Sequence, residues 1–189
     1  MALNTNCFLT EGLNLTGCTK DNSGGVNNVF LANFKELVPG GGNPELFFYD
    51  VTGSCEITSI STGATFYQFD TVKETSNLSE AVTVNVQNST ISFVPTINLV
   101  MNKLDTQKRN LIHMMATGVL VAVVEDNNGK YWMSGFTKGL DVTAVATETG
   151  TALGDRNGST VTLTGAEPLP MAQLDPTIVA GFLLDNVQY

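Results

Sequence analysis

A strict alternation of apolar and polar side chains is the feature that most constrains this fold. In the segment 81–86, valines at every second position alternate with threonine and asparagine. The segment 91–104 repeats the pattern with Ile91, Phe93, Pro95, Ile97, Leu99 and Met101. A period of two places successive side chains on opposite faces of a strand, so both segments are predicted to be half-buried strands. Because proline lacks the backbone N–H, Pro95 predicts a bulge or an edge position.

Other short apolar or aromatic runs bounded by turn residues predict further strands. These runs are 26–37, 45–51, 56–60, 65–70 and 160–164. The polar segment 72–80 lacks core residues and is predicted to be an extended loop. The segment from Leu140 to the turn at 154–158 is rich in threonine and alanine, and no strand is predicted there.

One helix is predicted at 105–116. Asp105 is a good N-cap residue, and Leu104, Leu111, Ile112 and Met115 then fall on one face at helical spacing. Gly118 is a natural helix stop. We expect this helix to flank a sheet.

A β-hairpin is predicted directly after the helix. Apolar segments at 119–125 and 130–136 flank the turn Asp126-Asn127-Asn128-Gly129. Asn-Gly between two apolar strands is a strong hairpin signal.

The chain length and the order of these segments predict one mainly β domain. With 189 residues the chain can build one domain with a sizeable core. We expect an antiparallel β-sandwich or barrel over 26–170, preceded by an N-terminal arm at 1–25 and followed by a C-terminal arm at 171–189. The apolar stretch within the last arm is compatible with a strand, a short helix or a docking arm.

Charge excludes one class of function. Only 14% of residues are charged, and 18 acidic against 9 basic residues give a net charge of -9. Phosphate binding depends on Lys and Arg, so the chain is not expected to grip nucleic acid. The sequence shows no signal peptide and no span of apolar residues long enough for a bilayer, which predicts synthesis in a cytoplasm. Cys7, Cys18 and Cys55 are interpreted as reduced thiols.

No catalytic, cofactor-binding or metal-binding residue is predicted. His113 is the only histidine and has no partner for a metal site or a catalytic triad. The turn at 126–129 lacks the downstream glutamate of a calcium loop, and Gly40-Gly41-Gly42 lacks the helix of a phosphate loop. Tyr131 and Trp132 are strand neighbours that face opposite ways. An enzyme is therefore not expected.

The order of segments resembles the tail tube (major tail) proteins of long-tailed bacteriophages, particularly those of phages with Bacteroidetes-type hosts. The blocks that carry the resemblance are Asp21–Val26 with Val29–Asn33, Leu99–Asp105, Val124–Trp132 and Leu153–Gly165. They span most of the chain from Asp21 to Glu167.

The resemblance implies a structural virion protein without a cofactor. Proteins of this family form homohexameric rings that stack into a tube, through which double-stranded DNA passes without specific binding. The implied partners are other copies of the chain and the tape measure, tail tip and tail terminator proteins, and the implied location is the virion tail. We expect a neutral or net negative lumen, because each bound phosphate would retard DNA.

Two other functions fit the same sequence features. One is another phage structural protein, namely a capsid decoration or head-tail connector protein. The other is a β-sandwich binding or adhesion module. The predicted helix and the lack of a secretion signal argue against the second alternative.

Overall fold

The computed structural model describes residues 23–37, 47–49, 56–60, 65–180 and 187–188. The strands are β1 (Val26–Asn33), β2 (Phe47–Tyr49), β3 (Glu56–Ile60), β4 (Phe66–Asp70), β5 (Asn77–Asn85), β6 (Thr90–Asn102), β7 (Leu120–Asp126), β8 (Tyr131–Ser134), β9 (Asp141–Glu148), β10 (Gly158–Thr164), β11 (Ala172–Leu174) and β12 (Val187–Gln188). The helices are α1 (Phe34–Leu37), α2 (Thr106–Thr117) and α3 (Pro176–Ile178). Within these ranges no helix has the length and apolarity needed to cross a lipid bilayer.

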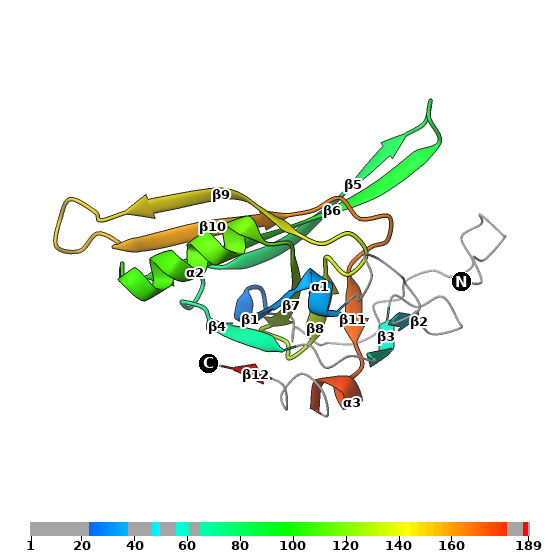
Figure 1. The fold of residues 1–189 in the computed structure, drawn as a ribbon, viewed down its shortest axis with the longest axis horizontal. Helices are drawn as coiled ribbons and strands as arrows, with labels where there is room; N and C mark the ends of the chain where they lie inside the picture. The colour runs from blue at the N-terminus through cyan, green and yellow to red at the C-terminus, as the bar shows by residue number, and fades with distance from the viewer. Residues whose placement is uncertain (1–22, 38–46, 50–55, 61–64, 181–186, 189) are drawn as a thin grey trace.

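The strands form two open sheets (Figure 1). The large sheet has eight strands in the order β12-β4-β1-β7-β8-β11-β3-β2, and the small sheet has four in the order β5-β6-β10-β9. All pairs are antiparallel except β11 with β3 and β12 with β4. The predicted mainly β fold is confirmed as two sheets, neither of which closes into a barrel.

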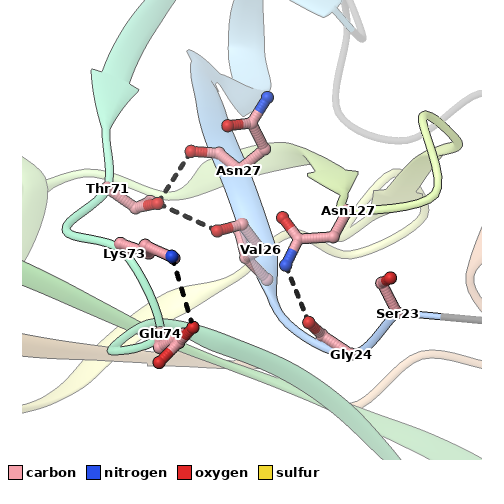
Figure 2. Close-up of a pocket in the computed structure, with 8 residues that line it drawn as sticks. All are labelled: Ser23, Gly24, Val26, Asn27, Thr71, Lys73, Glu74 and Asn127. Carbon is pink, nitrogen blue, oxygen red and sulfur yellow. Dashed lines mark hydrogen bonds and ion pairs between the residues drawn. The ribbon is translucent and has the colours of Figure 1, made fainter.

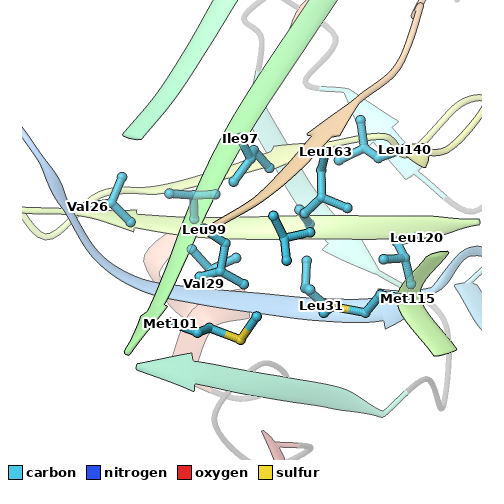
Figure 3. Packing of buried hydrophobic residues seen from close by; sticks show 13 residues of the cluster. Val26, Val29, Leu31, Ile97, Leu99, Met101, Met115, Leu120, Leu140 and Leu163 are labelled. Atoms are coloured by element: carbon cyan, nitrogen blue, oxygen red, sulfur yellow. The ribbon is translucent and has the colours of Figure 1, made fainter. Parts of the chain in front are cut away.

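The central strands of the large sheet are buried on both faces. In β1, Val29 and Leu31 join a cluster with residues of the small sheet, while Phe30 and Ala32 join a second cluster on the far face. Figure 3 shows the first cluster, which also receives Met115 from α2. Two-sided burial explains why β1 and β7 have continuous apolar runs in place of alternation.

Part of the expected C-terminal arm lies inside the large sheet. β11 pairs with both β8 and β3, and its Ala172 and Leu174 are buried. Ile178 and Val179 then pack on the far-face cluster. The three-residue strand is too short to show a period, which is why the sequence did not distinguish it from an arm. Of the predicted N-terminal arm, only residues 23–25 lie within the described part of the chain.

The predicted helix is confirmed, but its apolar face is only partly buried. The Asp105 carboxylate accepts the N–H of Thr106 at 2.7 Å, and Gly118 follows the last turn. Met115 is the buried residue of α2, whereas Leu111 is half-buried. Leu111 is therefore not the core anchor that helical spacing suggested.

Two segments differ from the sequence-based prediction. The loop predicted at 72–80 becomes β5 at Asn77, and the buried Ser76 Oγ accepts the N–H of Val100 at 3.1 Å. The segment following Leu140 forms β9, which the Thr- and Ala-rich composition did not predict. Both strands lie at the edges of the small sheet. Residues 77–80 of β5 and all of β9 bury no side chain, so these stretches lack the alternation of a half-buried strand.

Pro95 lies where β6 loses one of its two neighbours. Its register with β5 is unbroken at Glu80, so the pairing with β5 shows no bulge. On the other side the β10 ladder ends at Thr96, and pairing resumes only at the isolated bridge between Phe93 and Glu167. Pro95, which has no N–H to donate, therefore lies where β6 has no hydrogen-bonded neighbour on its β10 side.

The predicted hairpin is confirmed as β7 and β8 joined through residues 127–129. The N–H of Gly129 donates to the Asp126 carbonyl at 3.0 Å, and the N–H of Asp126 donates to the Lys130 carbonyl at 2.9 Å. Gly129 has a φ of 74°, in the left-handed region where a side chain costs energy. A three-residue loop with glycine at the left-handed position is a common hairpin connection.

Gly129→Ala is expected to lower the free energy of unfolding by about 1 kcal/mol through backbone strain. Gly154→Ala is the matched control, because an added Cβ meets open space at both glycines and only Gly129 has positive φ. Chemical denaturation would measure both. Equal stabilities of the two variants would contradict the strain argument.

Candidate interaction surfaces

The described residues form no recognisable chemical centre. They contain no group of three or more His, Cys, Asp or Glu side chains that could hold a metal ion. His113 is exposed on α2. Tyr131 and Trp132 face opposite sides, as predicted. The centroid of the Tyr131 ring lies 6.2 Å from the centroid of the Phe30 ring, whereas Trp132 Nε1 donates to Asp126 Oδ2 at 3.2 Å.

The carboxylate of Asp126 accepts hydrogen bonds from residues of the hairpin itself. Its Oδ1 accepts the N–H groups of Asn128 at 2.8 Å and Lys130 at 2.9 Å. Burial alone would raise the pKa of Asp126, but these bonds and the one from Trp132 outweigh it and lower the pKa below its ordinary value. The hydrogen bonds of Asp126 therefore stabilise the turn of the hairpin.

A polar cleft of about 650 Å³ lies where the described chain begins (Figure 2). Thr71 Oγ1 donates to the carbonyls of Val26 and Asn27, and Asn127 Nδ2 donates to the carbonyl of Gly24. These hydrogen bonds join residues of the cleft wall to one another. The charged residues of the described lining, Lys73 and Glu74, pair with each other at 3.7 Å (Figure 2), and this exposed pair does not indicate a catalytic site.

The two sheets differ sharply at their edges. The large sheet ends in β12 with two residues and β2 with three, whereas the small sheet ends in β5 with nine and β9 with eight. Short edge strands are one way in which proteins prevent unwanted pairing. Only the small sheet presents long edges in the described structure.

The two long edges also lack the usual protective residues. Neither β5 nor β9 contains Lys, Arg or Pro, and their only charged residues are Glu80, Asp141 and Glu148. The register between β9 and β10 shifts near Thr143, which leaves Ala144–Glu148 regular. Such strands offer unpaired N–H and C=O groups to another strand.

The outer face of the small sheet is covered by small neutral side chains. Asn98 Nδ2 donates to Asn77 Oδ1 at 3.0 Å, and Thr162 Oγ1 donates to Asn98 Oδ1 at 2.9 Å, which makes a row across three strands. Arg156 is paired with Glu148 at 2.7 Å and also donates to Thr160. The face thus carries no unpaired cation among the described strand residues and their direct contacts.

A third surface is the end of the β5–β6 hairpin, which projects from the body (Figure 1). Residues 81–91 are exposed on both faces of this hairpin. Its exposed apolar side chains, here called the hairpin stripe, are Val82 (54% exposed), Val84 (61%), Val86 (83%) and Ile91 (53%). Sequence alternation located these residues but predicted that they would be half-buried.

No protein-family model, curated protein or solved structure matches the chain. Function is therefore inferred from the surfaces of the molecule. In the part of the chain that the structure describes, the open edges and the hairpin stripe are the surfaces that no strand or side chain covers.

Proposed function

We propose that this protein is a structural subunit that assembles with its own copies into the stacked hexameric rings of a phage tail tube. The observation that carries the proposal is the pair of long, unprotected edges on the small sheet. Each copy presents one β5 edge and one β9 edge. Their pairing would satisfy backbone groups that have no strand partner among the described residues.

Strand direction favours a head-to-tail junction. All three pairs within the small sheet are antiparallel, so β5 and β9 run in opposite directions. When two copies in the same orientation meet, the β9 of one therefore lies antiparallel to the β5 of the next. Such a contact uses two different surfaces and closes into a ring when the rotation between copies permits it. The sixfold count comes from the family resemblance.

The neutral outer face supports a channel for DNA. A ring of small sheets would form a barrel whose inner wall is one face of every sheet. The opposite face is packed on the large sheet, so the row of Asn77, Asn98 and Thr162 would face inward. With Arg156 paired to Glu148, this wall offers DNA phosphates little to bind.

Lysines placed on the β9 edge are expected to prevent assembly. In Ala144→Lys/Ala146→Lys, the added charges would disfavour pairing with a second β5. Electron microscopy and sedimentation should show rings or tubes for the wild type and monomers for the variant. Both alanines are exposed, so the variant subunit should still fold.

The matched control is Ala152→Lys/Gly154→Lys, which adds the same charge in the exposed loop between β9 and β10. It should assemble like the wild type. Trimers, twelvefold rings or stable monomers of the wild type would contradict the proposal. The first two would favour a decoration or connector protein, and the last a binding module.

A further inference from the structure

We propose that α2 of one copy docks on the β5 side of the next copy in the same ring, where Met114 enters a pocket between the two sheets. This proposal rests on the proposed function, because it adds a side-chain contact to the junction of β9 with β5. Its occupant is a second copy of the chain. The contact uses the face of the small sheet that is directed away from the proposed lumen.

The pocket that would receive Met114 lies between the two sheets, beside the edge strand β5. It has a volume of about 240 Å³, and its lining includes Leu78 of β5, Trp132 of β8 and Met171. Leu78 packs against the cluster between the sheets, so the pocket lies on the face away from the proposed lumen. Small-molecule sites typically have volumes of about 300 to 1,000 Å³, and this smaller pocket suits a single side chain.

β7 places α2 and the pocket at opposite edges of the small sheet. At the start of β7, Leu120 is bridged to Leu140, directly before β9. At its end, Asp126 lines the pocket beside β5. β7 therefore crosses the small sheet from the β9 edge to the β5 edge. Figure 3 shows Val26, which also lines the pocket, and Met115 of α2 on opposite sides of the cluster between the sheets.

Met114 lies on the flank of α2 that is directed away from the small sheet's other strands. α2 contacts β9. On its inner flank, Lys108 Nζ donates to the Asn102 carbonyl of β6 at 2.5 Å, and Ile112 packs against the cluster between the sheets. Met114 follows Ile112 by two residues, about 200° around the helix, and is 58% exposed. A copy joined through β9 would therefore carry Met114 toward the β5 side of its neighbour.

Met114 and the pocket lie near the same height of the small sheet. Leu78 in the pocket pairs with Ile97 of β6. α2 starts just after β6 ends at Asn102, and it is followed by β7, whose first residue is bridged to the start of β9, level with Thr96. Met114 belongs to the last third of α2 and so lies near the height of Ile97. Copies in one orientation would bring Met114 close to the pocket.

The chemistry of Met114 suits a pocket that contains Trp132. A flexible thioether fills irregular spaces and makes favourable contacts with aromatic rings. Trp132 Nε1 already donates to Asp126, so the indole ring is left for apolar contact. The Asp126 carboxylate also accepts the N–H groups of Asn128 and Lys130. Entry of Met114 would thus bury apolar area without stranding this charge.

The charges of the two surfaces are complementary as well. Residues 103–124, which include α2, contain three Lys or Arg and one carboxylate, a net charge of +2. Residues 70–80, which lead into β5 and form its start, contain three carboxylates and one lysine, a net charge of -2. Copies of a chain with a net charge of -9 repel each other in general. A local pair of opposite charges therefore favours the contact of α2 with the β5 side.

The first test is Met114→Glu, compared with Ala116→Glu about 200° around the same helix. Both residues are exposed, so both variants should fold. Met114→Glu should raise the concentration needed for half-assembly about tenfold or more, because the added charge would be buried, while Ala116→Glu should assemble like the wild type. Sedimentation would measure this. Unchanged assembly of Met114→Glu would overturn the proposal and leave the β5–β9 junction intact, whereas a wild type that never forms rings would refute the proposed function itself.

The second test uses the wild-type chain and its single tryptophan, Trp132. Trp132 is half-buried in the pocket lining, and water would leave the pocket when Met114 enters. Its fluorescence emission should therefore shift to shorter wavelength when dissociated subunits form rings. The same emission in both states would overturn the proposal, because the pocket would then stay open in rings or would already be filled within one subunit.

Discussion

Replacing Phe30 with alanine is expected to lower the free energy of unfolding by about 3 to 5 kcal/mol. Phe30 lies in β1 between β4 and β7 and is 1% exposed. Its ring contributes to the far-face cluster and contacts Tyr131. The substitution removes a large apolar side chain and leaves a cavity in a sheet that is packed on both faces, so the surroundings cannot collapse easily.

Urea denaturation of the wild type and the variant would measure this loss. Val82→Ala is the control: it also truncates an apolar strand residue, but one that is 54% exposed, and it should change stability by less than about 0.5 kcal/mol. A loss of less than about 1 kcal/mol for Phe30→Ala would show that the far-face cluster is not a packed core.

Glu167→Ala is expected to have the second large effect, a loss of about 2 to 4 kcal/mol. The carboxylate is almost fully buried and accepts three backbone N–H groups, from Thr137 at 3.1 Å, Lys138 at 2.9 Å and Gly139 at 3.1 Å. The backbone of Glu167 also pairs with Phe93 of β6. One residue therefore ties together the connection from β8 to β9 and the base of the hairpin.

The loss arises because alanine leaves these N–H groups without their acceptor. The hydrogen bonds stabilise the folded state, and the desolvation of the buried carboxylate opposes this stabilisation. Burial raises the pKa of Glu167 above its ordinary value, and the hydrogen bonds from the three amides and from the Thr137 side chain lower it by less than burial raises it. The favourable hydrogen bonds are thus partly offset, which keeps the expected loss below the sum of three charged bonds.

The raised pKa also predicts a pH dependence. A carboxyl group whose pKa is higher in the folded state stabilises that state fully below its unfolded pKa, and the contribution is lost as pH rises through the folded pKa. The stability of the wild type relative to Glu167→Gln, which does not titrate, should therefore decrease between about pH 4 and about pH 7. Denaturation at both pH values would test this. A stability of the wild type that rises with pH relative to Glu167→Gln would contradict it.

Several elements could be predicted from the sequence because their signals are local. Asp105 and Gly118 mark the two ends of α2, and residues 126–129 mark the hairpin turn. Each signal depends on backbone geometry within a few residues, which neighbours in the chain determine. The alternation of β6 likewise reports its buried face from Pro95 to Leu99.

The remaining features depend on contacts between distant segments. β9 and the start of β5 are strands because β10 and β6 pair with them, and β11 is one because β8 and β3 lie on either side. The role of Glu167 was missed for the same reason, since its carboxylate meets amides 28 to 30 residues earlier in the chain.

Alternation in the sequence determined that Val84 and Ile91 would each lie on the apolar face of its own strand. Only the tertiary structure decided that this face would be uncovered, because the large sheet covers β6 near Leu99 and does not reach the hairpin end. A two-residue period fixes the face on which a side chain lies, but burial depends on what packs against that face.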